Sequence, residues 1–300
     1  MTWKLSGFAP KSQVQGALLA HEEIDDWDFE LTISGREIAE DRPQEWVLEA
    51  WYPRRPGKPQ KDALRTLFDG DPPEITVEKI LDQDWLTLSQ KGVKPIRAGP
   101  FHVHTRDYPS VPDAIDLTIP ASQAFGTGQH ETTAGCLEML ARMKGTGAHP
   151  RRIADIGTGT GLLAMAAIAL WPAAFATASD IDPVCAGVVE ENAALNSVEL
   201  GTGRGALSMI VAPGMDDELL RLRGPYDLLI ANILAGPLID LAPDFARSTT
   251  PGGNALLAGL LAGEQEDRVM RAYRRAGFRL AQRAVNGDWA ILWLRKRRGR

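Results

Sequence analysis

The feature that most constrains the fold is a glycine-rich turn, Asp155-Ile-Gly-Thr-Gly-Thr-Gly161, between two apolar patterns. Arg152–Ile156 has the pattern of a buried strand, and Leu162–Trp171 that of an apolar helix, which Pro172 ends. Glycine lets the backbone turn sharply and lets a ligand approach without a Cβ in the way. A buried strand, a glycine turn and a helix in this order are typical of an α/β sheet that binds ligands at the carboxyl ends of its strands.

The second half of the chain continues this alternation and predicts a doubly wound, mostly parallel sheet. Further strands are expected at Phe175–Asp180, Leu207–Val211, Tyr226–Leu234 and Ala255–Leu261. Helices are expected from Pro183 to about Asn196, from Pro237 to Ser248 and from Glu264 to Ala276. Two final strands, Phe278–Val285 and Trp289–Leu294, are expected to form an antiparallel pair at the sheet edge.

The first part of the chain predicts a separate small α+β domain. Strands are expected at Trp3–Phe8, Phe29–Ile33, Trp46–Tyr52 and Glu74–Ile80, with helices at Lys11–Ile24 and Lys61–Phe68. The order strand-helix-strand-strand-helix-strand matches the ferredoxin-like unit. This part has neither a glycine-rich loop nor a cluster of His, Asp and Glu, so we expect binding rather than chemistry from it. The predicted boundaries are 1–84 for this domain, 85–112 for a linker and 113–300 for the catalytic domain.

His102-Val-His104 lies in the predicted linker. Two histidines at positions i and i+2 of a strand face the same way and can share a metal ion. No third ligand is visible nearby in the sequence, so an ordinary half-buried strand is favoured. We expect no metal site in this chain.

Composition excludes several classes of protein. The formal net charge of -6 argues against a general nucleic-acid binder, which needs Lys and Arg for phosphate contacts, and suits a basic partner better. Only Cys136 and Cys185 occur, so neither a disulfide framework nor a paired-thiol metal site is indicated. No apolar run has the length of a membrane span. We therefore expect a cytoplasmic monomer without stable nucleic-acid or membrane binding.

The glycine spacing restricts the class of ligand that the turn can bind. A dinucleotide fingerprint would need a glycine where Leu162 stands, and the shorter Gly-x-Gly-x-Gly turn, with Gly157 and Gly159, suits a ligand that has no pyrophosphate. S-adenosylmethionine is such a ligand. Asp180, at the end of the next strand, can accept hydrogen bonds from both ribose hydroxyls. For Asp182 a helix-capping role is at least as well supported.

Asn232 lies near the end of the predicted strand Tyr226–Leu234. Its amide and the neighbouring carbonyls can hold an amine by hydrogen bonds while the amine lone pair faces a methyl group. The alternative is an Asn that only caps the following helix. Its place at the fourth strand tip favours a functional role.

A second glycine-containing segment, Ala124-Phe-Gly-Thr-Gly-Gln-His-Glu-Thr-Thr133, precedes the strand predicted at Arg152–Ile156. It is not a P-loop, because no Lys-Ser/Thr pair follows the glycines. It is not a zinc-binding His-Glu-x-x-His helix, because Ala134 stands where the second His would be. Thr132 and Thr133 are expected to start a helix that runs to about Met143, where their hydroxyls can cap it or meet a ligand carboxylate. Phe125 could cover an adenine ring or the sulfonium.

These segments together resemble the PrmA family of bacterial methyltransferases, which modify the eleventh protein of the large ribosomal subunit. The resemblance rests on Ala124–Thr133, the glycine turn, the acidic strand end and the exit Asn232-Ile-Leu-Ala235, and it spans about Ile119–Gly236. Ala121-Ser122 and Thr158 depart from the family pattern, in each case by exchange of one small residue for another.

The resemblance implies a class I S-adenosylmethionine-dependent methyltransferase, Rossmann-like with a mostly parallel seven-stranded sheet, preceded by the small ferredoxin-like domain as the substrate-recognition module. It implies methyl transfer to lysine side chains and to an N-terminal amino group of the ribosomal protein. Asn232 is expected to orient the amine, and no residue is assigned as a general base. The implied cofactor contacts are Thr133, Gly157, Asp180 and Asn232, with Phe125, Gly126, Thr127, Asp155 and Gly159 as neighbours.

An RNA or DNA base N-methyltransferase remains the alternative, because such enzymes also place Asn at the fourth strand tip. They usually follow it with Pro-Pro and an aromatic residue, whereas Ile233-Leu234 follow here. The basic segment Arg295–Arg300 could serve as a nucleic-acid arm, although a solvated tail is favoured. An NAD-dependent dehydrogenase is disfavoured by the glycine spacing, and a non-catalytic adenosine-binding module by the intact strand tip at Asn232.

Overall fold

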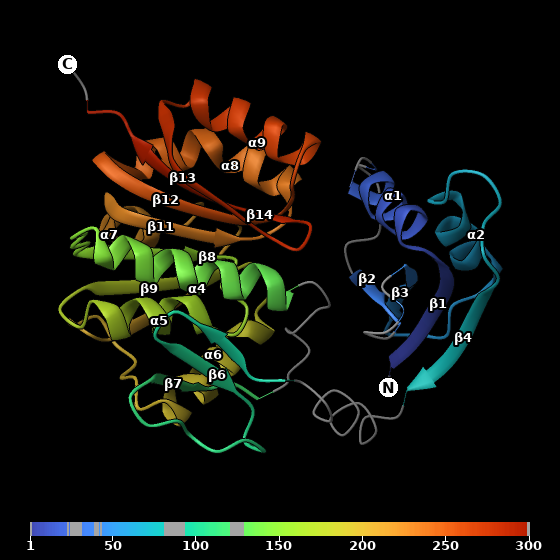
Figure 1. The fold of residues 1–300 in the computed structure, drawn as a ribbon, viewed down its shortest axis with the longest axis horizontal. Coiled ribbons are helices and arrows are strands. Elements are labelled where there is room, and N and C mark those ends of the chain that lie inside the picture. The colour runs from blue at the N-terminus through green and yellow to red at the C-terminus, as the bar shows by residue number, and fades with distance from the viewer. Residues whose placement is uncertain are drawn as a thin grey trace. The chain divides into compact units, whose positions relative to one another are not determined.

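The structure, a computed structural model, describes residues 2–22, 24, 32–38, 42, 44–80, 94–120 and 129–298. The chain divides into two compact units, here called the small domain, which ends at Gly92, and the large domain, which begins at Val93. Figure 1 labels the elements of both. No helix in the described ranges is long and apolar enough to cross a membrane.

The small domain has the predicted ferredoxin-like topology. Its elements in chain order are β1 (Thr2–Pro10), α1 (Lys11–Glu22), β2 (Thr32–Glu37), β3 (Glu45–Tyr52), α2 (Lys58–Thr66) and β4 (Ile75–Ile80). The strands form one antiparallel sheet in the order β2-β3-β1-β4. Val14 of α1 and Leu64 of α2 share one buried cluster with Leu5 and Leu48 of the central strands, so both helices cover the same sheet face. The strand predicted at Phe29–Ile33 lies mostly outside the described residues.

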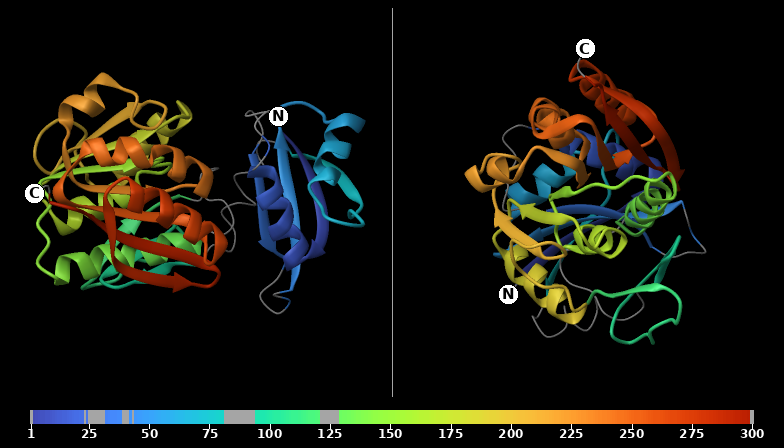
Figure 2. Two further views of the ribbon diagram at one scale, coloured as in Figure 1. Left: turned by 90° about the horizontal axis from the view of Figure 1, so that it is seen from above. Right: turned by 90° about the vertical axis from the view of Figure 1, so that its left-hand side faces the viewer.

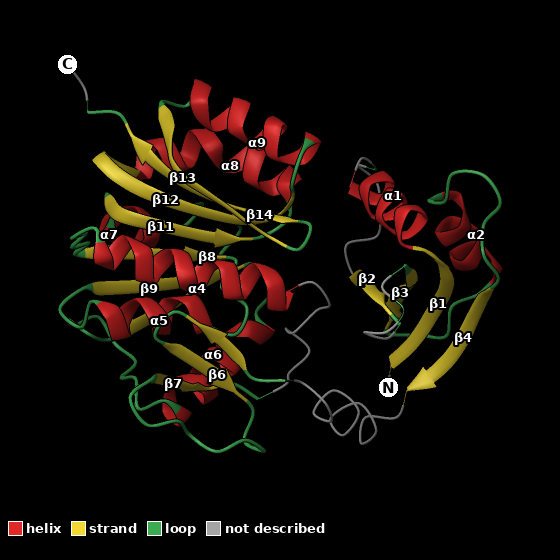
Figure 3. Ribbon diagram, in the orientation of Figure 1, coloured by secondary structure: helices red, strands yellow, loops and turns green. Residues whose placement is uncertain are grey.

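The large domain contains the predicted doubly wound sheet (Figure 3). Its strands are β8 (Arg152–Ile156), β9 (Phe175–Asp180), β10 (Leu207–Val211), β11 (Tyr226–Asn232), β12 (Thr249–Leu261), β13 (Phe278–Asn286) and β14 (Trp289–Lys296). Their order is β10-β9-β8-β11-β12-β14-β13, and all neighbours are parallel except at β14, which is antiparallel to both β12 and β13.

Helices cover both faces of this sheet (Figure 2). They are α4 (Gln129–Gly145), α5 (Leu162–Leu170), α6 (Val184–Leu195), α7 (Glu218–Arg223), α8 (Ala235–Ser248) and α9 (Glu264–Arg275). Leu292 of β14 belongs to the same buried cluster as Phe245 of α8 and Tyr273 of α9. Its neighbour Ile291 points to the other face, where a Cβ on Gly135 of α4 would come within 2.5 Å of the Ile291 side chain. Gly135 therefore allows α4 to pack closely on the sheet.

A three-stranded sheet precedes α4 within the large domain. It contains β5 (Ile96–Ala98), β6 (Phe101–His104) and β7 (Ile115–Thr118) in that order. The segment predicted as a linker, 85–112, thus differs from the structure over residues 94–112, which fold with the large domain. The amide of Asn196, just after α6, accepts a hydrogen bond from the Thr118 nitrogen and donates one to its carbonyl, at 2.7 and 2.8 Å.

Other local predictions also differ from the structure, among them the strand predicted at Tyr226–Leu234, which ends at Asn232. Helix α4 already includes Gln129, so Thr132 and Thr133 do not start it and neither is its N-cap. Strand β12 begins at Thr249 rather than at the predicted Ala255, so it includes Pro251-Gly-Gly253. Helix α7 was not predicted; Asp217 caps it by accepting hydrogen bonds from the nitrogens of Leu219 and Leu220.

Candidate functional site

The register of the central strands brings three predicted site residues to one level. Ile156 of β8 lies opposite Ser179 of β9, and Asp155 of β8 lies opposite Ile230 of β11. One residue further on, Gly157 and Asp180 leave their strands side by side, with Asn232 level on the other flank. The chain order of strands reverses between β8 and β11, which is the point where sheets of this kind bind ligands.

The glycine turn requires glycine for its backbone. Gly157, Gly159 and Gly161 have φ values of 69°, 55° and 78°, in the left-handed region that residues with a Cβ rarely adopt. The backbone nitrogens of Gly157 and Thr158 donate to the carbonyl of Ser179, at 2.8 and 3.0 Å. The turn is therefore held against the end of β9, next to Asp180.

Ile233, the residue after Asn232, holds the strand tips together. A Cβ on Gly157 would lie 2.3 Å from the Ile233 side chain, and a Cβ on Gly259 of β12 would lie 2.3 Å from the Ile233 carbonyl oxygen. Both glycines have positive φ values. The exit of β11 thus fits into space left by two glycines, and this fixes the position of Asn232 relative to the turn.

Asp155 supports the turn from within. Its side chain is buried and accepts hydrogen bonds from the Thr158 hydroxyl at 2.6 Å and from the Ala164 nitrogen in the first turn of α5 at 3.2 Å. Burial raises the pKa of Asp155 to about 7, an effect that its two hydrogen bonds partly oppose and the charge of Asp180 increases. The structure gives Asp155 a supporting position beneath the turn, and a direct cofactor contact stays a prediction.

Asp180 faces the turn with lone pairs to spare. One carboxylate oxygen accepts from the Gly159 nitrogen at 2.8 Å and the other from the Asp182 nitrogen at 3.1 Å. Each oxygen can accept a further hydrogen bond. Asp182 itself accepts from the Val184 nitrogen at 2.9 Å, which supports the capping role for that residue.

The side-chain amide of Asn232 is half-buried and makes no hydrogen bond with any residue that the structure describes. Its donors and acceptor are therefore available at the level of Gly157 and Asp180. Thr133 lies on α4 and is buried. The other predicted contacts from the preceding segment, Phe125, Gly126 and Thr127, lie outside the described residues.

The family model described as ribosomal protein L11 methyltransferase (PrmA) matches residues 21–297. The ribosomal protein L11 methyltransferase of Agrobacterium fabrum is 38% identical over 271 residues, which cover 89% of this chain and 90% of that protein. That of Rhizobium meliloti is 42% identical over 223 residues, 73% of this chain and 74% of that protein. This chain belongs to the ribosomal protein L11 methyltransferase family.

A solved structure agrees with this family assignment. The ribosomal protein L11 methylase of Lactobacillus delbrueckii subsp. bulgaricus aligns with a TM-score of 0.56 at 28% identity, and the match covers 69% of this chain and 100% of that one. The predictions of a methyltransferase and of a Rossmann-like fold behind a small N-terminal domain are confirmed.

One residue at this edge of the sheet was not singled out from the sequence. Ile181 follows Asp180 directly, and its side chain is 71% exposed although it is large and apolar. Ile181 is therefore a candidate contact for an apolar part of a ligand bound at this edge. The signal was its position one residue after the strand end, where the alternation of the buried strand stops.

Proposed function

We propose that this chain transfers methyl groups from S-adenosylmethionine to lysine side chains and to the N-terminal amino group of ribosomal protein L11. The observation that carries the proposal is the convergence of Gly157, Asp180 and Asn232 at one sheet edge. It occurs in a chain whose relatives are named ribosomal protein L11 methyltransferase and match it over 90% and 74% of their own length. These residues, with Thr133 and the neighbours predicted from the sequence, are the proposed site.

The described residues fit the cofactor. The turn offers backbone with no Cβ at Gly157 and Gly159, Asp180 has lone pairs free for two ribose hydroxyls, and Ile181 offers an apolar surface for adenine. When bound, S-adenosylmethionine supplies an electrophilic methyl group on a positively charged sulfur. No metal is needed for such a transfer, because the sulfonium already activates the methyl carbon.

Asn232 is the residue we assign to the amine. Its carbonyl oxygen can accept a hydrogen bond from the nucleophilic nitrogen, which points the nitrogen lone pair along the line of displacement. A lysine amine has a pKa of about 10.4 and must lose its proton before attack. Transfer from water into a closed site favours the neutral amine, whose proton is released to solvent, and no residue is assigned as a general base.

The small domain is proposed as the module that recognises the protein substrate. Residues 1–80 carry 16 acidic and 10 basic side chains, whereas the remainder carries 23 of each, so the net charge of -6 lies in the first part of the chain. An acidic surface suits a basic protein partner. We further propose that the enzyme is a cytoplasmic monomer that forms no stable complex with nucleic acid.

The test is transfer of radiolabel from S-adenosylmethionine to purified ribosomal protein L11, with total ribosomal RNA as a parallel substrate. We expect label in the protein and on its amino groups, identified by mass spectrometry of peptides. Label in RNA alone would favour the base-methylating alternative, and label in neither would contradict the proposal.

A further inference from the structure

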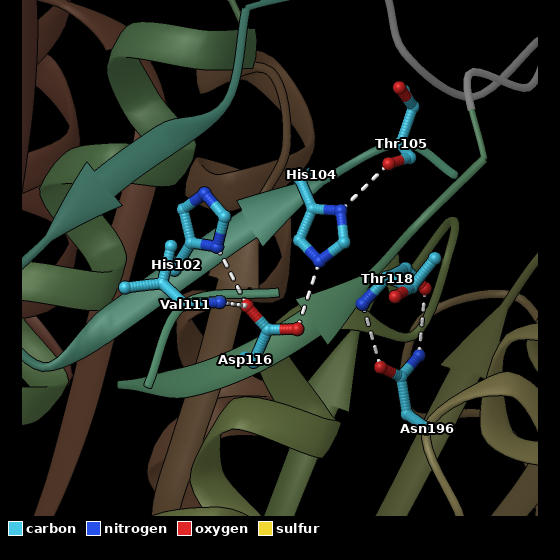
Figure 4. Close-up of polar contacts among 7 residues, drawn as sticks. All are labelled: His102, His104, Thr105, Val111, Asp116, Thr118 and Asn196. Carbon is cyan, nitrogen blue, oxygen red and sulfur yellow. Dashed lines mark hydrogen bonds and ion pairs between the residues drawn. The ribbon is translucent and has the colours of Figure 1, made fainter. Parts of the chain in front are cut away.

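A second cluster of chemistry-bearing side chains lies in the three-stranded sheet of the large domain (Figure 4). His102 and His104 stand two residues apart on β6, and Asp116 stands opposite His102 on the parallel strand β7. His102 Nδ1 lies 2.7 Å from one Asp116 oxygen, and His104 Nε2 lies 2.9 Å from the other. Both histidines are buried, and the Asp116 side chain is 21% exposed.

Both ring nitrogens of His104 face oxygen atoms that accept hydrogen bonds. Its Nδ1 lies 2.7 Å from the carbonyl oxygen of Thr105, which can only accept, so Nδ1 carries the proton. In a neutral imidazole Nε2 then holds a lone pair, yet it faces a carboxylate oxygen, which is also an acceptor at neutral pH. Either Nε2 carries a second proton, so that His104 is an imidazolium, or a bound cation lies beside the two lone pairs.

We propose that His102, His104 and Asp116 bind one divalent transition-metal ion of the zinc class. Their ligating atoms lie within 4.8 Å of one another. The bond from His104 Nδ1 to a backbone carbonyl is the contact that fixes the tautomer of a metal-binding histidine and presents its other nitrogen to the ion. Two imidazole nitrogens and one carboxylate suit zinc or its neighbours, whereas calcium and magnesium prefer an all-oxygen set.

The site provides three protein ligands, and water completes the shell on the partly exposed side of Asp116. The ion would join β6 to β7, whose chain continues through Ile119 and Pro120 toward the segment that precedes α4. Its role there is to hold the two strands in register, and the inference does not depend on the substrate of the methyl transfer.

The sequence did not reveal this site, because the third ligand is twelve residues from His104. A loop separates them, and only the parallel pairing of β6 with β7 brings Asp116 beneath both rings. Sequence spacing alone does not distinguish Asp116 from the nearby acidic residues Asp107 and Asp113.

The experiment uses the full-length chain after chelator treatment, titrated with zinc chloride by calorimetry and with cobalt(II) chloride by visible absorption. We expect one equivalent of zinc to bind, cobalt bands typical of nitrogen and oxygen ligands in a low-symmetry site, and a zinc-dependent rise of roughly 5 °C in the unfolding temperature. Asp116→Asn and His104→Gln should each weaken zinc binding by about 100-fold or more.

His149→Gln is the matched control, because His149 is exposed and outside the cluster; it should bind zinc as the unchanged chain does. Cys185→Ser serves the same purpose for the half-buried thiol. If the cluster variants fail to fold, proton NMR of the cobalt-loaded unchanged chain decides, since two shifted imidazole N–H signals are expected. The proposal is overturned if no stoichiometric zinc binds, if Asp116→Asn binds it equally well, or if a control loses it. The cluster would then be a metal-free imidazolium pair.

Discussion

The two domains of this chain differ in the direction in which their neighbouring strands run. The small domain pairs antiparallel strands, and Lys4 of its central strand β1 forms ion pairs with Glu49 and Glu78 on the two neighbouring strands. The large domain aligns parallel strands, so that Gly157, Asp180 and Asn232 leave the sheet at one level. Parallel strands gather their carboxyl ends at one edge, whereas antiparallel strands send neighbouring ends to opposite edges. The residues of the proposed site therefore lie together because the strands of the large domain are parallel. The small domain is proposed to bind the protein substrate.

The test with the largest expected effect removes the small domain. A chain that begins at Val93 should bind S-adenosylmethionine with nearly unchanged affinity but lose methylation of L11 almost completely, because β5 and all later elements belong to the large domain. Calorimetry with the cofactor and radiolabel transfer to L11 are the two measurements. Efficient methylation by the truncated chain would show that recognition lies in the large domain.

The next test acts within the large domain. Asp180→Ala should weaken cofactor binding about 100-fold, because it removes two charge-assisted hydrogen bonds to ribose and also the support of the Gly159 nitrogen. Asp182→Ala is the matched control; it removes a bond to the Val184 nitrogen and should change cofactor affinity by only a few-fold. Calorimetry gives both dissociation constants, and equal effects would refute the ribose assignment.

A third test measures how the stability of the large domain depends on pH. In the described part of the chain, Asp155 is the carboxyl group whose pKa is raised, to about 7 from an ordinary value of 3.8. Its protonated form is favoured in the folded protein, so the associated stability is fully present below pH 4 and is lost as pH rises through 7. Relative to Asp155→Asn, the unchanged chain should lose up to about 1.4 kcal/mol of unfolding free energy per pH unit between these values.

Urea unfolding at several pH values between 4 and 8 measures this difference. Glu266→Gln is a useful contrast, because hydrogen bonds from Arg283 lower the pKa of that carboxyl from its ordinary value of 4.5, so its contribution to stability is lost only as pH falls below that value and stays constant over most of this range. A flat difference between the unchanged chain and Asp155→Asn across this range would mean that Asp155 is ionised throughout.

The smallest expected effect concerns salt. If the acidic small domain attracts the substrate, raising monovalent salt from about 50 to about 200 mM should raise the KM for L11 several-fold. The dissociation constant of the cofactor should change less than two-fold, because its contacts are local to the sheet edge. Steady-state kinetics at fixed cofactor saturation measures the KM for L11. A KM independent of salt would show that charge on the small domain does not contribute to recognition of L11.

Local patterns were enough to predict most of the fold. Strands β8, β9 and β10 begin and end where apolar runs meet glycine, proline or charged residues, and the structure keeps the predicted boundaries of all three. Helix α7 was missed because six residues carry too little periodicity, although Asp217 and the basic last turn were visible signals. Strand β7 was missed because its alternation of apolar and polar residues, Ile115-Asp-Leu-Thr118, extends over only four residues.

The site was predictable only where its parts lie on single elements. Glycine spacing indicated the turn, and strand ends indicated Asp180 and Asn232, because each signal is local. The wedge of Ile233 between Gly157 and Gly259, and the pairing of Asp116 with two histidines, depend on register between strands far apart in the sequence. Such contacts follow from tertiary packing, which periodicity does not encode.

The amide of Asn196 has a consequence for the behaviour of the protein in a crowded solution. Strand β7 is the outer strand of its sheet, and an outer strand presents a row of unpaired backbone groups to which another chain can add. Asn196 occupies both the nitrogen and the carbonyl of Thr118, as a neighbouring peptide would. The Asn196 side chain therefore prevents another strand from pairing with β7 at Thr118. Asn196→Ala should make the protein more prone to aggregate without changing any residue of the proposed site.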